Sequence, residues 1–353
     1  MSNRSLIRHF YAWQKTDAAL VLATVIHTEG STYSKAGRHI LIRASGEHAG
    51  LLSGGCLEGD LAEQARSVFS SGTPRTVTYD MRDAADDLWG IGLGCNGMMQ
   101  ILLQRLNNDN DWQPFISLAA AMASTAASTA ALVTASDAAV LPPGTCFIDA
   151  GGGNWRAASA QDMAPHYPLT GQAPSAKLPA IIRHEGPDAC EILHWRIIPW
   201  PRVLLLGAGP DAVPVVQLAA ILGWEITVAD HRPHYIENGK FTAADRLVLV
   251  EPDRINEMLP LDHYSAVVIM SHHIDTDRSY LRQLAASPLS AQSYVGILGP
   301  VARRAKLLGE LGLTATDFAS RLHGPVGLDI GADSPETIAL SLISEIQSVG
   351  SST

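Results

Sequence analysis

The fold of this chain is decided by the stretch VLLLGAGPDAVPVVQLAAILGWEITVAD, residues 203–230. Its apolar start, Val203–Leu206, predicts a buried strand, and the G-x-G-x-x-A pattern of Gly207–Ala212 then opens a helix. Gly207 permits a tight turn, and Gly209 lets the backbone approach a pyrophosphate. A second apolar strand closes on Asp230, where a dinucleotide-binding fold places the carboxylate that binds the ribose. The stretch therefore predicts a Rossmann-type β-α-β unit and a candidate site for NAD(P) or another nucleotide.

The same alternation of short apolar runs and helical stretches continues to the C-terminus. Strands are predicted at 203–206, 225–229, 247–250, 266–270 and 294–298, and helices at 211–222, 277–286, 301–311 and 335–348. Five such strands indicate a Rossmann-like, doubly wound parallel sheet with the strand order 3-2-1-4-5. His272 follows the fourth strand, at the sheet edge where such folds bind ligands, and is a candidate base or hydrogen-bond donor.

Two prolines, Pro199 and Pro201, mark the predicted domain boundary, because the residue before a proline favours extended linker conformations. We therefore expect an N-terminal mixed α/β domain at 1–198 and a Rossmann-like domain at 199–353. In the first, a helical pattern near the start and another at 57–70 accompany predicted strands at 20–27, 39–43, 49–53, 76–80 and 97–106. Farther along, a helix, a strand at 131–135 and loops at 151–153 and 157–180 are expected.

The segment Ser53-Gly54-Gly55-Cys56-Leu57-Glu58 carries the chemistry of the N-terminal half. A thiol at a helix N-terminus has a lowered pKa, and glycine amides beside it form a hollow that binds anions. Gly54, Gly55, Cys56 and Glu58 are therefore candidate cofactor-binding residues, with Cys56 as a thiolate or a soft ligand for a metal or sulfur. The alternative is a small cysteine that fills a tight turn.

A second cysteine lies in a similar setting, in Gly90-Ile91-Gly92-Leu93-Gly94-Cys95-Asn96-Gly97. So many glycines require unusual backbone angles or the close approach of a ligand. Gly94 and Cys95 therefore join the candidate residues. A third glycine-bearing loop, Glu29–Gly37, offers hydroxyls and Lys35 to an anion. Three such loops in one domain predict a site built from loops on a rigid scaffold.

Composition excludes several classes of protein. The chain has 353 residues, of which 46% are hydrophobic and 17% charged, which is typical of a globular chain with two cores. A net charge of −10 makes nucleic acid an unfavourable partner. No long apolar run predicts a membrane helix or a secretory signal, so we expect a cytoplasmic protein. None of the 4 cysteines forms a C-x-x-C pair, so neither a disulfide framework nor a metal site made of protein ligands alone is expected.

Taken together, these motifs resemble the XdhC/CoxI family of xanthine dehydrogenase accessory factors. The resemblance covers most of the chain. It rests on these segments: Gly30-Ser31-Thr32, Gly37, Ser53–Glu58, Gly92–Gly97, Gly207-Ala208-Gly209, Val228–Arg232, Ser271-His272, Tyr294–Gly299 and Arg321–Gly331. Pro210 stands where the family commonly has a histidine after the Rossmann glycines.

The resemblance implies a molybdenum cofactor chaperone rather than an enzyme. Such a protein binds molybdopterin as cargo and holds it while a cysteine desulfurase replaces an oxo ligand by sulfur. It then hands the cofactor to a molybdenum hydroxylase of the xanthine dehydrogenase type. The resemblance also implies a homodimer or larger oligomer. Two other interpretations stay open: an NAD(P)-dependent oxidoreductase that uses Asp230 and the His272 region, and a regulatory module with an inactive nucleotide site.

Overall fold

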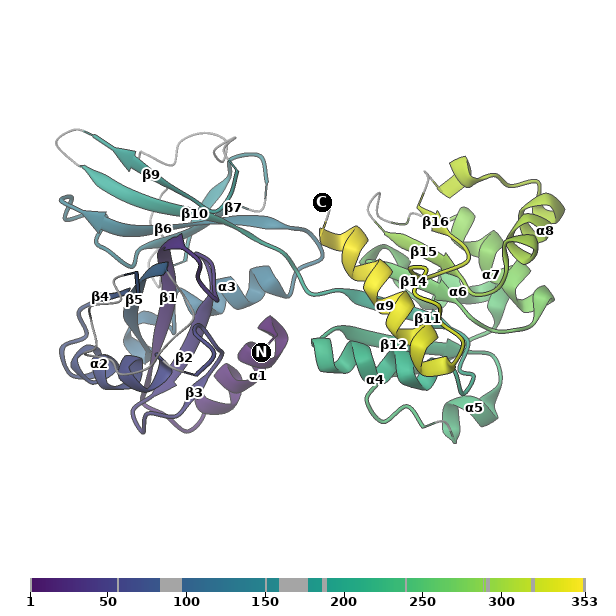
Figure 1. Ribbon diagram of the computed structural model, residues 1–353, viewed down its shortest axis with the longest axis horizontal. Helices are drawn as coiled ribbons and strands as arrows, with labels where there is room; N and C mark the ends of the chain where they lie inside the picture. Colours follow the sequence, from purple (N-terminus) through teal and green to yellow (C-terminus); the bar gives the residue numbers. More distant parts are fainter. Residues whose placement is uncertain are drawn as a thin grey trace. The chain divides into compact units, whose positions relative to one another are not determined.

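The computed structural model describes residues 2–55, 57–82, 97–149, 151–158, 177–185, 189–238, 240–287, 289, 293–318 and 321–351. The chain forms two compact units, Met1–Pro199 and Trp200–Thr353. The first is a mixed α/β unit and the second a Rossmann-like parallel α/β unit (Figure 1). This is the fold class expected from the sequence.

The first sheet of the N-terminal unit is antiparallel, with the strand order β3-β2-β1-β5-β4. Its strands are β1 (Ala19–Gly30), β2 (His39–Arg43), β3 (His48–Ala49), β4 (Arg75–Asp80) and β5 (Gly97–Asn107). Helix α2 (Glu58–Ser71) packs on it through Leu61, Ala65 and Val68. The strand predicted at 49–53 was too long. It ends at Ala49 because Gly50 turns the chain with a φ of +112° and lies against Ile40.

A second antiparallel sheet, which the sequence did not reveal, completes the N-terminal unit. Its strands, in the order β8-β7-β6-β10-β9, are β6 (Ser128–Ser136), β7 (Cys146–Asp149), β8 (Trp155–Ala157), β9 (Ala180–His184) and β10 (Cys190–Ile197). Only β6 was predicted. β8 ends and β9 begins at the two end residues of the loop expected at 157–180, and positions 159–176 of that loop lie outside the described residues. Trp195 of β10 packs against Gly37 and His39, so the two sheets share a contact.

The N-terminal unit also contains the helices α1 (Asn3–Trp13) and α3 (Phe115–Met122). Helix α1 is amphipathic, as its sequence predicts, and buries Leu6, Phe10 and Trp13. The ring of Phe10 packs on that of Phe115 in α3, with 4.7 Å between the centroids. This contact joins the start of the chain to the segment between the two sheets.

The C-terminal unit has a parallel sheet of six strands in the order β13-β12-β11-β14-β15-β16. The strands are β11 (Arg202–Leu206), β12 (Glu225–Asp230), β13 (Arg246–Leu249), β14 (Ala266–Ile269), β15 (Tyr294–Ile297) and β16 (Leu322–His323). The five predicted strands lie in the predicted order. The sequence missed β16, because two residues carry no periodic pattern.

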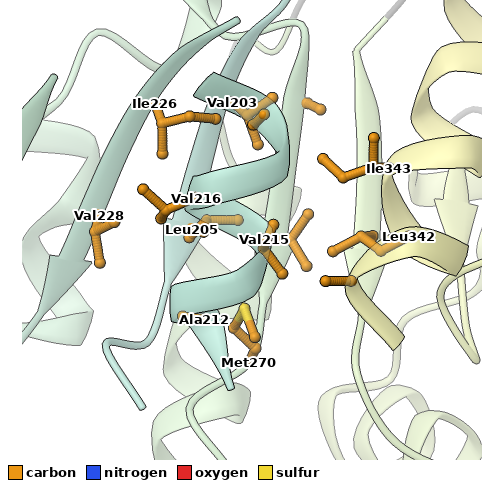
Figure 2. Packing of buried hydrophobic residues seen from close by; sticks show 14 of the residues in the cluster. Val203, Leu205, Ala212, Val215, Val216, Ile226, Val228, Met270, Leu342 and Ile343 are labelled. Carbon is orange, nitrogen blue, oxygen red and sulfur yellow. The ribbon is translucent and has the colours of Figure 1, made fainter. Parts of the chain in front are cut away.

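Helices pack on both faces of this sheet (Figure 1). They are α4 (Ala212–Leu222), α5 (Pro233–Glu237), α6 (Ile255–Met258), α7 (Ile274–Ala285), α8 (Val301–Leu311) and α9 (Pro335–Ser351). Figure 2 shows Val203 and Leu205 of β11 facing Val215 of α4, with Leu342 and Ile343 of α9 beside them. Alternate β11 residues face α6, α7 and α8 instead. Both faces of β11 are thus buried, which explains its continuous apolar run.

Two buried histidines predict that acid destabilises the N-terminal unit. Burial lowers the pKa of His39 and of His194 from 6.5 to about 4. Between those values the unfolded chain binds more protons than the folded one, so the free energy of unfolding falls as the pH drops. We expect His39 alone to account for a loss of about 3 kcal/mol. This loss of free energy is measured by following the urea unfolding of the N-terminal unit at several pH values from 7 to 4.

The matched controls are His39→Gln, which removes the titrating ring, and His48→Gln, which changes an exposed histidine on β3. The first variant should unfold with a weaker pH dependence than the natural chain. The second should leave that dependence unchanged. Equal pH dependence in all three proteins would show that burial of His39 does not cause the acid sensitivity.

Candidate functional site

The glycine-bearing loops of the N-terminal unit are anchored at one end of its first sheet. Gly30, the last residue of β1, pairs with Gly97, the first residue of β5, and Thr24 pairs with His39 at the start of β2. Strand β3 returns the chain to this end, where Ser34 Oγ donates a hydrogen bond to Leu51 O over 3.4 Å. The loops 31–38 and 50–57 therefore meet, and the segment before Gly97 rejoins the sheet at the same end.

Glu58 organises the loop that precedes helix α2. Its carboxylate, in a residue that is 1% exposed, accepts four hydrogen bonds. The amides of Leu52 and Ser53 donate to Oε1 over 2.7 and 3.0 Å. Ser53 Oγ and the amide of Gly55 donate to Oε2 over 2.6 and 3.1 Å. Glu58 thus fixes the backbone from Leu52 to Gly55 in one conformation.

The charge of Glu58 is stabilised inside the protein. Burial by itself raises the pKa of this carboxyl group, but the hydrogen bonds from Ser53 Oγ and from the Leu52 and Ser53 amides outweigh burial and lower the pKa below its ordinary value. The group is therefore a carboxylate at neutral pH. Because both of its oxygens are already bonded within the loop, Glu58 shapes the site rather than presenting a free charge to a ligand.

The neighbouring glycines are required by backbone conformation. Gly54 and Gly55 have φ values of +81° and +110°, in the region that favours glycine. A Cβ added at either position would meet no atom within 4 Å, so this part of the loop is uncrowded. Cys56 itself lies outside the described residues, as do Gly94 and Cys95. The amide of Leu57 donates to Ser53 Oγ over 2.8 Å, so the backbone is anchored just before and just after Cys56.

In the C-terminal unit, the Rossmann glycines Gly207 and Gly209 each lie close to another part of the chain. Gly207 has a φ of +130°, and a Cβ there would lie 2.5 Å from Met270 O, so only glycine fits between β11 and β14. A Cβ at Gly209 would lie 2.5 Å from Asp211 Oδ1. The first glycine therefore serves packing, while the second lies beneath a carboxylate.

Asp230 closes β12 next to this loop and is bonded within the protein. Its Oδ2 accepts from the amide of Ala208 over 2.7 Å and from Arg232 Nη2 over 2.7 Å. Its Oδ1 accepts from the amide and Nε of Arg232, each over 2.9 Å. Burial raises the pKa of this carboxyl group, but the bonds from Arg232 and Ala208 outweigh burial and lower the pKa below its ordinary value. Asp230, the candidate for binding a ribose, and Arg232 therefore bind each other.

His272 lies over the same loop. Its Nε2 donates to Asp211 Oδ2 over 2.6 Å, and its Cδ2 would lie 3.7 Å from a Cβ at Gly209. His272 has a φ of +61°, a left-handed conformation that is uncommon for a residue other than glycine. Such strain, about 1–3 kcal/mol, persists where the surroundings demand it and is concentrated at functional sites. The structure thus joins His272 to Asp211, a pairing that the sequence did not show.

Sequence reasoning also missed a buried ion pair at this edge of the sheet. Asp277, 1% exposed, accepts a hydrogen bond from Ser271 Oγ, and its Oδ2 accepts from Arg303 Nη2 over 2.6 Å. The position of Arg303, in the first turn of α8, could have predicted this ion pair. A cation in the first turn of a helix opposes the helix dipole, so a nearby carboxylate was to be expected.

A further buried cluster fixes the loop that follows β16. Glu345 of α9 accepts from Tyr294 Oη over 2.5 Å and from the amide of Gly327 over 2.7 Å. His323 Nδ1 lies 3.2 Å from Glu345 Oε1, and its ring stacks on that of Tyr294. Burial and the bond to Glu345 raise the pKa of Tyr294 well above its ordinary value. The motif Arg321–Gly331 is thereby bound to the last helix.

Two kinds of feature are absent from the described part of the chain. No three His, Cys, Asp or Glu residues are grouped there so that they could hold a metal ion. Nor does that part contain a helix with the length and apolar character needed to cross a membrane.

These features define a two-unit α/β protein in which a glycine-cysteine loop and a Rossmann sheet occupy separate units. The chain belongs to the XdhC and CoxI family. The model of that family matches residues 13–80, and the model of the XdhC Rossmann domain matches residues 203–346. The membership expected from the motifs is confirmed.

Relatives match the chain along nearly its whole length. A protein from Bacillus subtilis, named as a probable subunit of xanthine dehydrogenase, is 32% identical over 92% of each chain. The molybdenum cofactor insertion chaperone PaoD from Escherichia coli is 21% identical, over 98% of this chain and 88% of its own. A solved structure described as a xanthine dehydrogenase from Bacillus halodurans is 30% identical, covers 100% of this chain and 96% of its own, and has a TM-score of 0.77.

Proposed function

We propose that this protein binds molybdenum cofactor and serves the maturation of a molybdenum hydroxylase of the xanthine dehydrogenase type. The observation that carries the proposal is similarity over almost the whole chain to two relatives. One is named as a probable part of xanthine dehydrogenase, and the other as a molybdenum cofactor insertion chaperone. Both units of the chain take part in these matches.

The loop 52–58 supports this role by its chemistry. Glu58 holds the loop in one conformation before any ligand arrives, so binding costs little ordering of the chain. Cys56 supplies a soft sulfur ligand, which suits molybdenum or a dithiolene sulfur. The amide of Gly54, which unlike that of Gly55 is not among the groups that donate to Glu58, suits the phosphate of the pterin. We assign Gly54, Gly55 and Cys56 to contacts with the cargo, Gly94 and Cys95 to the same site, and Glu58 to its support.

In this proposal the protein holds the cofactor while a cysteine desulfurase replaces an oxo ligand by sulfur, and then delivers it to the hydroxylase in the cytoplasm. The chaperone is not itself consumed. The desulfurase carries the sulfur as a persulfide, and a thiol reductant supplies the two electrons that convert it to sulfide. The sulfide replaces the oxo ligand on molybdenum, the oxygen leaves as water, and the thiols leave as a disulfide. Open space beside Gly54 and Gly55 suits cargo that must later be released.

The test is to purify the full chain from cells that make molybdenum cofactor and from cells that cannot. The first preparation should contain molybdenum, by elemental mass spectrometry, and the fluorescent oxidised pterin, in a constant ratio to protein. The second should contain neither. Protein from cofactor-making cells that carries no pterin, and takes up none when free cofactor is added, would contradict the proposal.

We also propose that the protein is a homodimer, as the family resemblance implies. Light scattering at micromolar concentration should then return about twice the chain mass of 37.6 kDa. A mass equal to that of one chain over the whole concentration range would contradict this part of the proposal.

A further inference from the structure

We propose that Asp211 is a specificity-determining residue of the Rossmann unit, and that its carboxylate excludes the phosphates of NAD(P) from the glycine loop. This inference concerns a different unit from the loop 52–58, and its outcome is independent of the function proposed for that loop.

The first step is the position of the carboxylate. In a dinucleotide site, the second glycine of the pattern leaves room for the pyrophosphate to approach the backbone. Here that glycine is Gly209, and the space beside its Cα is taken by Asp211 Oδ1, 2.5 Å from where a Cβ would lie. A phosphate oxygen and this carboxylate oxygen cannot occupy the same place. The chain's own anion therefore replaces the anion of a ligand.

The second step is that the carboxylate is held there. His272 Nε2 donates to Asp211 Oδ2 over 2.6 Å, and the imidazole lies on the same side of Gly209. His272 adopts a left-handed backbone conformation to reach this place. The two residues are 61 positions apart in the sequence, on different strand-to-helix connections. Asp211 is thus fixed across the opening of the loop rather than free to turn aside.

The third step is electrostatic. Asp211 lies at the N-terminus of α4, where the helix dipole would otherwise favour a phosphate. Its carboxylate places a negative charge within a few ångströms of any phosphate bound there, and like charges repel strongly when partly shielded from water. Asp230, the group expected to bind a ribose, is bonded to Ala208 and Arg232 instead. Both polar recognition points of a dinucleotide site are therefore used internally.

The test measures binding of NADH and NADPH to the full chain by the fluorescence anisotropy of the reduced nicotinamide. The natural chain should show no saturable binding up to about 1 mM. Asp211→Asn keeps the shape of the side chain but removes its charge, and Asp211→Ala also opens the space. Each variant should bind at least one of the two ligands roughly tenfold more tightly than the natural chain, or better. Both variants should fold, because Asp211 makes no side-chain cap to α4, and circular dichroism checks this.

His272→Gln is the matched control, because it removes the imidazole but leaves the carboxylate charge. Because the charge remains but the carboxylate is no longer held by the imidazole, its gain in binding of either ligand should be clearly smaller than that of Asp211→Asn. Micromolar binding of NADH or NADPH by the natural chain, unchanged in Asp211→Asn, would overturn the inference. So would folded Asp211→Asn and Asp211→Ala proteins that bind neither ligand, or a gain in His272→Gln equal to that in Asp211→Asn.

Discussion

Replacing Glu58 by alanine is expected to release the loop 52–55 and to lower the free energy of its local opening by about 3–5 kcal/mol. The variant leaves the amides of Leu52, Ser53 and Gly55 without their acceptor. Each buried amide without a partner costs about 1–3 kcal/mol, and water entering the relaxed loop recovers part of this. Hydrogen exchange of these amides should therefore be roughly a hundredfold faster or more, and cofactor retention should fall with it.

Glu63→Ala is the control for this prediction. Glu63 lies on the same helix, its side chain is 59% exposed, and it pairs with Arg66 on the surface. Its removal should change the exchange rates of the loop by less than twofold. Glu58→Gln keeps the size but supplies one acceptor oxygen where two are used, so its effect should lie between those of the other variants. Unchanged exchange in Glu58→Ala would show that the loop does not depend on this carboxylate.

Acid should destabilise the loop 52–55, as the Glu58→Ala substitution does. The pKa of Glu58 is lower in the folded protein than in the unfolded chain, so the stabilisation is complete above the ordinary glutamate pKa of 4.5 and is lost as the pH falls through the lower folded value. This window begins near the lower end of the one expected for His39, so most of the His39 effect develops before the Glu58 effect as the pH falls.

The Rossmann unit could be predicted almost completely because its sequence carries a signal at each level. Its main strands are short apolar runs, its helices show amphipathic or apolar periodicity, and Gly207 and Asp230 mark the first β-α-β unit. The second sheet of the other unit lacks such signals. Strands β7 and β8 have only four and three residues, and the partners of β7 on β6 belong to a stretch of Ala, Ser and Thr. Long-range pairing, not local pattern, makes these residues strands.

The candidate site was predicted as a set of residues but not as a set of contacts. The motif Ser53–Glu58 identified the loop, yet it could not show that Glu58 is buried and bonded to its own backbone. Asp211 and His272 were each visible in the sequence, but their pairing depends on the sheet order that sets β11 beside β14. Residue type and spacing therefore indicate chemistry, whereas the fold decides which charges remain available to a ligand.

Replacing Cys56 by serine is expected to abolish retention of the molybdenum cofactor while the fold persists. Serine is close in size to cysteine, and the backbone on either side is anchored through Gly55 and Leu57. The stability of the N-terminal unit should therefore change by no more than about 1 kcal/mol. A serine hydroxyl stays protonated at neutral pH and is a poor ligand for molybdenum or sulfur. Molybdenum and pterin per chain should fall roughly tenfold or more, measured on protein purified from cofactor-making cells.

Two further cysteines make this result specific. Cys146 is buried on β7, where burial raises the pKa of its thiol to about 12, so it supplies no thiolate, and Cys146→Ser should keep its cargo. Cys95→Ser should lose cargo as Cys56→Ser does if the loop before Gly97 contributes to the same site, as its anchoring opposite Gly30 leads us to expect. If Cys56→Ser retains molybdenum and pterin as well as the natural chain, Cys56 only fills a turn. The cargo must then be held by other groups of the loop that Glu58 keeps in place.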